Sequence, residues 1–366
     1  MFTAKTIAER DQFLDLKHDW DILSAADDNA SLCNAFEWVE SWIHSYWTPE
    51  FRLHITVIES NSKVVAILPL YLDMEKRKCL LLGSGEPECC EVASEYLDFL
   101  VSTASFAREE IYTYIANCLS SIPCSSMEFV NCLNSSHVFK IAEEMSLSIV
   151  AATGKQYRLG LNKDYSQLQQ GFSKNQKKKS REILNRFHKT NELMFKTVTN
   201  DDYSENWMVL RNLHTKDWQS RGKSGAFVSN VFNDFHAYMN RQYPNIQQLF
   251  SYLLHDNEVI AINHYYRYKK VLYFYQAGSV KHNYKRFSPG YLLHNLCLSE
   301  LSGSDLEYDF MKGSLKNSYK AKFGNATGIF YTIKLFNSDL PGKLAFAQCK
   351  IHAMLSLLKK KLKQLF

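Results

Sequence analysis

Two apolar runs flank a short polar turn in Leu249-Phe-Ser-Tyr-Leu-Leu-His-Asp-Asn-Glu-Val-Ile-Ala-Ile-Asn-His-Tyr-Tyr266. Apolar runs separated by such a turn predict a β-hairpin. The first half of the chain contains the same arrangement in Leu53-His-Ile-Thr-Val-Ile-Glu-Ser-Asn-Ser-Lys-Val-Val-Ala-Ile-Leu-Pro-Leu-Tyr71. Within the two segments, Lys63-Val-Val-Ala-Ile67 aligns with Glu258-Val-Ile-Ala-Ile262, 195 residues further along. The repeat indicates that the two halves of the chain are related by duplication.

The order of elements after each hairpin supports the duplication. The first half continues with a strand (78–82), an insertion around Gly83-Ser-Gly85, the apolar run 96–101, a helix (106–119) and a strand (127–132). The second half continues with a strand (271–277), a basic loop, a helix (289–301) and a strand (306–311). A helix that connects two strands in this way makes an α/β crossover unit. We therefore expect two tandem α/β domains built on mixed sheets.

The composition is that of a globular protein of about two domains. The chain has 366 residues, of which 46% are hydrophobic and 22% charged, with a formal net charge of +5. The nine cysteines show no metal-ligand spacing, so we expect reduced thiols, no metal and a cytoplasmic protein. The first 20 residues lack the apolar core of a signal peptide, and no stretch approaches the roughly 20 apolar residues of a spanning helix.

Three further helices are predicted from the spacing of apolar residues. They cover about 164–187, 203–218 and 344–366, and the last is amphipathic and ends in a run of lysines. We expect this last helix to pack on the second domain, because Phe346, Ile351 and Leu355 would otherwise be exposed. The most plausible boundary between the halves is Ala151-Ala-Thr-Gly154. The predicted domains are therefore 1–153, 154–340 and, for the basic helix, 341–366.

A helix start with neighbouring basic residues predicts a binding site for an anion. In Tyr284-Lys-Arg-Phe-Ser-Pro-Gly-Tyr-Leu-Leu293, Ser288 is a favoured N-cap and Pro289 fits the first helical position. The exposed N–H groups and the positive end of the helix dipole suit a pyrophosphate, and Lys285 and Arg286 add positive charge. The alternative is an ordinary capped helix beside a solvated basic loop.

Three segments together resemble one family of enzymes. They are Ser288-Pro-Gly-Tyr-Leu-Leu293, Asp309-Phe-Met-Lys-Gly313 and Tyr319-Lys320. They resemble the CelD/BcsL-type acyltransferases of the GNAT superfamily, whose architecture is similar to that of the FemABX aminoacyl transferases. Weaker similarity covers most of the chain, including Glu95-Tyr-Leu-Asp98. The resemblance implies two tandem GNAT-type domains, with the acyl-donor site in the C-terminal one.

The resemblance also implies roles for individual residues. The pyrophosphate of acetyl-CoA, or of another acyl-CoA, would be held by the segment comprising Lys285, Arg286, Phe287, Ser288, Pro289, Gly290 and Tyr291. Tyr319 and Lys320 would lie near the transferred acyl group or the acceptor. An acyl transfer from a thioester needs a proton source for the leaving thiolate, and Tyr319 could supply it. Asp309, at the end of a strand, belongs to the same predicted catalytic group.

Other polar residues have both a structural and a functional interpretation. His214, on the helix that also carries Trp218, is either a general base or a hydrogen-bonded structural residue. Asp98, at the end of an apolar strand, is a candidate base or acceptor-binding group in a cleft between the domains. The basic cluster Lys174-Asn-Gln-Lys-Lys-Lys-Ser-Arg181 is a solvated helix face, a site for a polyanionic acceptor or phosphates, or a tRNA surface.

The leading functional hypothesis is an acyltransferase. It would move an acyl group, acetyl in the simplest case, from acyl-CoA to an amine or hydroxyl of a small-molecule, sugar or peptide-like acceptor, in exopolysaccharide, cellulose or cell-envelope biosynthesis. One alternative takes the acyl group from aminoacyl-tRNA, which is the one case in which we expect a nucleic acid partner. The other is a non-catalytic GNAT-fold scaffold. In any of these, the C-terminal helix is a candidate contact to a membrane synthase or to the inner face of the membrane.

Overall fold

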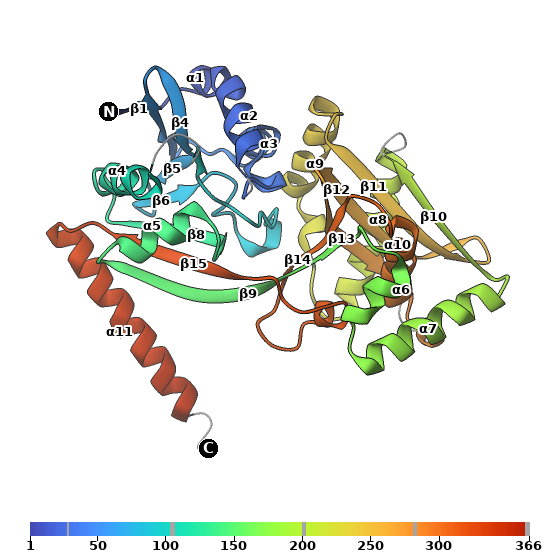
Figure 1. Ribbon diagram of the computed structural model, residues 1–366. Helices are drawn as coiled ribbons and strands as arrows, with labels where there is room; N and C mark the ends of the chain where they lie inside the picture. Colours follow the sequence, from blue (N-terminus) through green and yellow to red (C-terminus); the bar gives the residue numbers. More distant parts are fainter. Residues whose placement is uncertain (28, 103–106, 200–202, 281–283, 363–366) are drawn as a thin grey trace.

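The computed structural model describes residues 1–27, 29–102, 107–199, 203–280 and 284–362. Two α/β halves lie side by side, and long strands connect them (Figure 1). One sheet has four strands in the order β1-β3-β4-β7, and the other has eleven in the order β10-β11-β12-β13-β14-β9-β15-β8-β6-β5-β2. Each half contains both parallel and antiparallel pairs, which confirms the expected mixed α/β class.

Both predicted hairpins are present, and their turns are of the same type. They are formed by β3 (Ile55–Ser60) with β4 (Lys63–Leu68), and by β11 (Gln247–His255) with β12 (Glu258–Tyr268). The turn residues Asn61 and Ser62 have φ of 51° and 59°, and Asp256 and Asn257 have 47° and 67°. Two central residues with positive φ define a type I′ turn, whose twist matches that of the flanking strands.

The two hairpins also share an irregularity in strand pairing. The register shifts between Ile58 and Glu59 in the first hairpin and between Leu253 and Leu254 in the second. These positions are again 195 residues apart. A β-bulge is a specific local geometry rather than a random defect. Its recurrence at the same place therefore supports the duplication more strongly than the five-residue sequence match does.

The crossover units follow as predicted. In the first half they are β6 (Lys78–Leu81), α4 (Arg108–Ser120) and β8 (Ser126–Leu133). In the second half they are β13 (Val271–Ser279), α10 (Pro289–Leu301) and β14 (Glu307–Gly313). In both halves the two strands are parallel, as a helical crossover requires. The apolar run 96–101 is a strand only at β7 (Leu100–Val101).

The halves exchange their last strands. After β8 the chain enters β9 (Ser148–Gly160), which pairs with β14 of the other half. After β14 it enters β15 (Gly328–Phe336), which returns to pair with β8. The two exchanged strands also pair with each other and thereby join the half-sheets. The predicted division at residues 153 and 154 falls inside β9, so the residue at which one domain ends stays a prediction.

The other helices and strands have the following bounds. They are β1 (Phe2–Ile7), α1 (Arg10–Asp15), α2 (Lys17–Ala26), α3 (Phe36–Tyr46), β2 (Phe51–Leu53), β5 (Leu70–Asp73), α5 (His137–Glu144), α6 (Tyr165–Leu168), α7 (Lys174–Lys189), β10 (Leu193–Thr199), α8 (Tyr203–Gln219), α9 (Asn230–Gln242) and α11 (Leu340–Leu362). The helix predicted over 164–187 is divided, because a short 3₁₀ turn and Phe172 separate α6 from α7.

A common aromatic core joins the two halves. Trp38 on α3 is fully buried, and its ring centroid lies 4.9 Å from that of Phe235 on α9 and 5.7 Å from that of Tyr266 on β12. Trp20 and Trp42 are buried in the same cluster. These three tryptophans are therefore core residues.

The expectation that the C-terminal helix packs on the predicted second domain, residues 154–340, is confirmed for Phe346 and was wrong for Ile351 and Leu355. α11 projects away from the first half (Figure 1), and Ile351 and Leu355 are 57% and 51% exposed. Phe346 packs against Phe336 of β15, with ring centroids 5.4 Å apart, although β15 pairs with β8 of the first half. Residues 363–366 of the predicted helix lie outside the described residues. None of the described helices is both long enough and apolar enough to cross a membrane.

Candidate active site

The two parallel strands of the second half separate after three residue pairs. Val271 to Tyr273 of β13 pair with Glu307 to Asp309 of β14, although both strands continue beyond that point. Beyond these three pairs, β13 remains paired with β12, and β14 remains paired with β9. Met311, with φ of 59°, lies at a register shift of β14 just beyond the separation. The strands therefore open toward the end of β13 that leads into α10.

The start of α10 leaves backbone N–H groups available. The predicted first residue, Pro289, is confirmed, and Ser288 occupies the N-cap position. Ser288 has φ of 43°, however, and its side chain makes no capping hydrogen bond, which corrects the expectation of a capped helix. Gly290 is partly exposed, and a Cβ added there would come no nearer than 3.9 Å to another group. An uncapped helix start of this kind favours an anion.

The equivalent helix of the first half has the opposite character. α4 begins with Arg108, and both Glu109 and Glu110 lie in its first turn. Carboxylates in the first turn complement the helix dipole themselves and repel an anionic ligand. The first turn of α10 contains no acidic residue. Of the two duplicated helix starts, the one in the second half is therefore the better candidate for binding phosphate.

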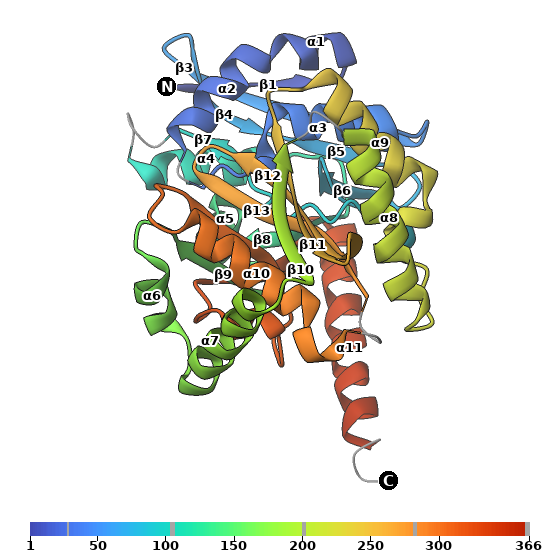
Figure 2. The ribbon, with the colours of Figure 1, turned by 90° about the vertical axis from the view of Figure 1, so that its right-hand side faces the viewer.

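Basic residues from a distant part of the sequence surround the start of α10. Helix α7, which contains the predicted basic cluster, lies alongside α10 (Figure 2). The ammonium of Lys179 lies 5.0 Å from the centroid of the Tyr291 ring, and Arg186 donates a hydrogen bond to the carbonyl of Arg286. Arg286 is exposed, and its guanidinium lies 3.1 Å from Glu192. The structure thus brings two predicted cationic segments into one region.

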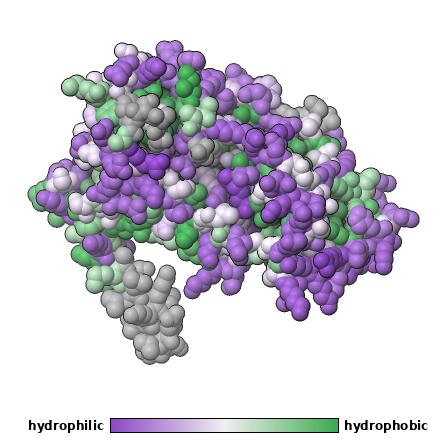
Figure 3. All heavy atoms as spheres, in the orientation of Figure 1, coloured by the Kyte–Doolittle hydropathy of each residue, from purple (hydrophilic) through white to green (hydrophobic). Residues whose placement is uncertain are grey.

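Buried polar contacts hold α7 against α10. The hydroxyl of Ser180 lies 3.0 Å from that of Tyr291 and donates to Oδ1 of Asn295 at 2.5 Å. Phe287 is buried in the core of the second half, whereas Lys285 lies in the short 3₁₀ helix before α10. Within the predicted cofactor segment, Phe287 therefore has a packing role. The surface over α7 is hydrophilic (Figure 3).

Tyr319 and Lys320 form a short 3₁₀ turn after β14. Tyr319 is 45% exposed, and partial burial raises the pKa of its hydroxyl. Lys320 donates to the carbonyl of Lys312 at 2.7 Å. Burial lowers the pKa of Lys320, although the carboxylates of Glu95 and Asp309 act in the opposite direction. The structure therefore brings three of the predicted catalytic residues, Tyr319, Lys320 and Asp309, into one neighbourhood.

Asp309 is fully buried and its oxygens are occupied. They accept hydrogen bonds from the Tyr96 hydroxyl at 2.7 and 2.8 Å, from Nε of Arg158 at 2.8 Å, and from the N–H of Met311 at 2.6 Å. Tyr96 belongs to the first half and Asp309 to the second. The carboxylate therefore connects the halves and fixes the bulge of β14, which is a positioning role.

Asp98 and His214 lie in different surroundings. Asp98 accepts the N–H groups of His137 and Val138, at 2.8 and 2.9 Å, at the start of α5, and burial raises its pKa to about 6. His214 is buried on α8 beside Gly225 and Phe227, and burial lowers its pKa to about 4. Among the described residues, neither makes a hydrogen bond or ring contact with Tyr319, Lys320 or Asp309.

Glu95 and His294 also lie beside these residues, although neither was predicted from the sequence to belong to the site. Glu95 accepts the N–H of Lys312 at 2.5 Å, and burial raises its pKa to about 7 despite the nearby Lys320. The ring of His294 on α10 lies 6.0 Å from that of Tyr319, centroid to centroid, and Nδ1 lies 2.8 Å from the Tyr308 hydroxyl. The only sequence signal was the position of Glu95 in a short motif.

The tautomer of His294 follows from a chain of hydrogen bonds. Tyr308 donates to the hydroxyl of Tyr265 at 3.1 Å, and Tyr265 donates to Sγ of Cys297 at 3.2 Å. Because Tyr308 donates its only hydroxyl proton to Tyr265, the Tyr308 oxygen must accept from His294, and Nδ1 of His294 is the donor. Burial lowers the pKa of His294 to about 3, so the ring is neutral. Nε2 therefore carries a lone pair, as a fixed acceptor near Tyr319.

A cavity of about 840 Å³ lies between the halves. Its walls include Tyr96, Asp98, Arg158, Tyr273 and Glu307. It therefore reaches the hydrogen-bond network of Asp309. Among the described residues, no group of three His, Cys, Asp or Glu is placed to hold a metal ion.

Comparisons with known proteins agree with this architecture. Residues 174–321 match the sequence model of a family described as Acetyltransferase (GNAT) domain. A tandem GNAT protein from the clavulanic acid biosynthesis pathway is 13% identical, with a TM-score of 0.51 and coverage of 93% of this chain and 100% of that one. Two duplicated α/β units of this kind define a tandem GNAT-type fold. The C-terminal part of the chain therefore matches a GNAT acetyltransferase domain, and the whole chain shares the tandem GNAT-type fold.

Two other solved structures share the fold over nearly the whole chain. The C-terminal domain of an Agrobacterium fabrum protein named as a lysylphosphatidylglycerol synthetase is 12% identical, with a TM-score of 0.52 and coverage of 93% and 96%. A conserved protein of unknown function from Bacteroides thetaiotaomicron is 10% identical, with a TM-score of 0.51 and coverage of 92% and 100%. A sequence search of the curated proteins found no match.

Proposed function

We propose that the protein transfers an acyl group from acyl-CoA to an amine or hydroxyl acceptor, with the donor bound at the start of α10. The observation that carries this proposal is the uncapped start of α10, flanked by the basic residues of α7, within the segment that matches an acetyltransferase domain. The resemblance of Ser288 to Leu293 and of Asp309 to Gly313 to CelD/BcsL-type enzymes favours an acceptor from exopolysaccharide, cellulose or cell-envelope biosynthesis.

The residues at the start of α10 fit the phosphates of coenzyme A. The N–H groups of Gly290 and Tyr291 have no cap from Ser288, and they lie at the positive end of the helix dipole. The exposed side chains of Arg286 and Lys179 supply positive charge nearby. The thioester that the donor carries supplies the activated carbonyl. The protein must then position an acceptor, remove a proton from it and donate a proton to the leaving sulfur.

Glu95 and Tyr319 suit these two proton transfers. When an amine attacks the thioester carbonyl, a C–N bond forms and the C–S bond breaks. Glu95, with a pKa of about 7, takes the proton that the amine loses. Tyr319 gives its proton to the leaving sulfur, and the proton held by Glu95 then restores the Tyr319 hydroxyl through solvent. The neutral His294 keeps a lone pair at Nε2, on a ring 6.0 Å from that of Tyr319, and can accept a hydrogen bond from a bound group there.

A second candidate function uses aminoacyl-tRNA as the donor. It is favoured by α7, which presents Lys174, Lys177, Lys178 and Arg181 with Glu182 as its single acidic residue. A helix face of this charge suits a polyanion, and its binding would fall steeply with salt. The scaffold hypothesis differs from both, because it requires no donor to bind.

Thermal unfolding with added donor separates these functions. Acetyl-CoA should raise the melting temperature, since a ligand that binds only the folded state adds about 2.7 kcal/mol of stability at a hundredfold excess over its Kd. The control is coenzyme A without the acyl group, which should stabilise the protein through the same phosphates. If neither ligand shifts the melting temperature at millimolar concentration and tRNA does, the donor is aminoacyl-tRNA. If no donor has any effect, the protein is a scaffold.

A further inference from the structure

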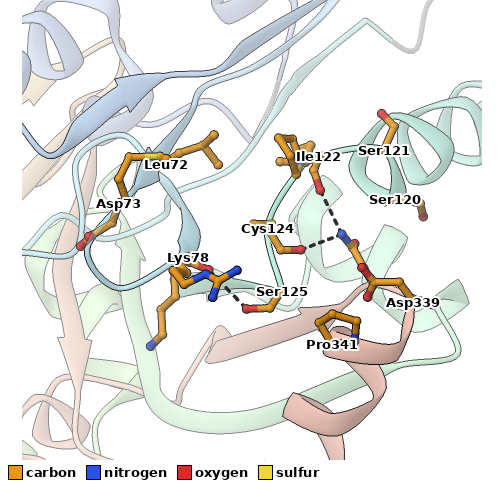
Figure 4. Close-up of a pocket in the computed structure, with 14 residues that line it drawn as sticks. Leu72, Asp73, Lys78, Ser120, Ser121, Ile122, Cys124, Ser125, Asp339 and Pro341 are labelled. Atoms are coloured by element: carbon orange, nitrogen blue, oxygen red, sulfur yellow. Dashed lines mark hydrogen bonds between the residues drawn. The ribbon is translucent and has the colours of Figure 1, made fainter.

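Helix α11 leaves the body of the protein from a fixed root. The side chain of Asn337 donates to the carbonyls of Ile122 and Cys124, at 2.9 and 2.7 Å (Figure 4). Asp339 then accepts the N–H of Gly342 at 2.8 Å and caps the first turn. Gln348, Cys349 and His352 line a pocket together with residues of β8 and β15, and beyond His352 the helix extends away from both halves (Figures 1 and 2). Its direction is therefore set at the root, while its remaining length is free to contact something else.

One side of α11 carries an exposed apolar line. Leu344, Ile351 and Leu355 are 56%, 57% and 51% exposed. Their separations of seven and four residues place them on one face, since each residue advances about 100° around a helix. Phe346 comes two residues after Leu344, about 200° around, and so packs on the body from the opposite side. The apolar line thus faces away from the protein.

The charge of α11 is of one sign. From Leu340 to Phe366 the sequence has no aspartate or glutamate, and it has lysines at 343, 350, 359, 360, 361 and 363, the last of which lies outside the described residues. Two such helices from two copies would bring like charges together with no carboxylate to offset them. An anionic partner surface with an apolar interior matches both the lysines and the apolar line.

We propose that α11 is a membrane-surface helix that lies flat on an anionic lipid bilayer, with Leu344, Ile351 and Leu355 inserted at the level of the headgroups. Apolar side chains on one face and lysines around them are the features of helices that bind in this way. Anionic headgroups attract each lysine and concentrate the protein at the surface. Because the root of α11 is fixed, binding would hold the two α/β halves close to the bilayer.

The test is flotation of the full chain with vesicles of phosphatidylcholine, with or without about a third phosphatidylglycerol, at low and moderate salt. The variant Ile351→Glu with Leu355→Glu disrupts the apolar line. Its matched control is Met194→Glu with Met208→Glu, which makes the same change in charge at side chains that are 47% and 56% exposed on β10 and α8. A third variant replaces Lys359, Lys360 and Lys361 with glutamine.

The full chain should bind the anionic vesicles and not the neutral ones. The α11 variant should bind at least tenfold more weakly, the control within about twofold of the unaltered chain, and the lysine variant without preference for anionic lipid. Equal binding by the α11 variant and its control would overturn the proposal. So would self-association of the full chain through α11, seen by light scattering, without binding to vesicles.

Discussion

Asp309 and Glu95 are both buried carboxyl groups near Lys320, yet their contacts give them different tasks. Asp309 accepts from Tyr96, Arg158 and Met311, so its oxygens are committed to connecting the two halves and to fixing the bulge of β14. Glu95 accepts one backbone N–H, and burial raises its pKa to about 7. A group that titrates near neutral pH is suited to take a proton during turnover.

The rate of transfer should depend on pH through Glu95. A base must be deprotonated, so kcat/KM should fall about tenfold per pH unit below about pH 7, as Glu95 becomes protonated. Glu95→Gln should lower the rate by roughly 10²-fold or more and remove this dependence. The measurement is release of coenzyme A thiol from acetyl-CoA between pH 5 and 8.

The matched control is Glu86→Gln. Burial also raises the pKa of Glu86 to about 7, and it lies in the same loop, bonded to Trp42 and Val92. This variant should still show the fall in kcat/KM below about pH 7. If Glu86→Gln removes this fall in kcat/KM and Glu95→Gln keeps it, Glu95 is not the base.

Removing the Tyr319 hydroxyl tests the proton source for the leaving sulfur. Tyr319→Phe keeps the ring that packs near His294, so donor affinity and melting temperature should change little. Turnover should fall by roughly 10²-fold, because the thiolate would leave without a proton donor. Tyr114→Phe, on α4 of the first half, is the control and should leave turnover unaltered. Unchanged turnover in Tyr319→Phe would make Tyr319 a packing residue.

At the scale of elements, α7 and α10 act together although about a hundred residues separate them in sequence. The contact depends on Ser180 and Asn295, which give no signal in the local pattern. The bounds of α10 were predictable, because Ser-Pro-Gly marks a start and the apolar residues continue to Leu301. The missing cap was not, since it depends on the left-handed conformation of Ser288. Sequence could therefore locate the helix but not its neighbours.

Replacing one cation beside α10 should weaken donor binding without unfolding the protein. Arg286→Ala should raise the Kd for acetyl-CoA about tenfold or more, the scale of a hydrogen bond between charged groups. Stability should change by less than about 0.5 kcal/mol, because Arg286 and its partner Glu192 are 65% and 51% exposed. Arg211→Ala, at an exposed position of α8, is the control, and titration calorimetry is the measurement. Equal affinities in both variants would place the phosphates elsewhere.

At the scale of the whole molecule, duplication was readable from the sequence and strand exchange was not. The hairpins repeat because their turn residues and apolar runs are local features, as in Asn61-Ser62 and Asp256-Asn257. The partner of a strand depends on which edge lies nearby in the folded chain. Neither β9 nor β15 was predicted as a strand from the sequence, and the expected domain boundary fell inside β9, although each strand completes the other half's sheet. Two domains divided at one residue would fold separately, whereas exchanged strands make each half depend on the other.

Two truncated chains test whether the halves fold separately or depend on each other through the exchanged strands. A chain that ends at Ser338 loses α11 and keeps β15, and it should fold with a melting temperature within a few degrees of the full chain. A chain that ends at Thr327 also loses β15, including Phe330, Ile333 and Leu335, which are at most 1% exposed. Burying each such side chain contributes about 1.5–3 kcal/mol, so the loss approaches a total stability of about 5–15 kcal/mol.

The shorter chain should therefore be unfolded or aggregated in both halves, because β8 and β9 would each lose a paired edge. Circular dichroism and limited proteolysis with mass analysis of the fragments are the measurements. The 1–338 chain controls for the loss of α11 itself. A protease-resistant fragment from the second half of the 1–327 chain, with native-like melting, would mean that this half folds without β15. The exchange would then be a contact between independent domains rather than a condition for folding.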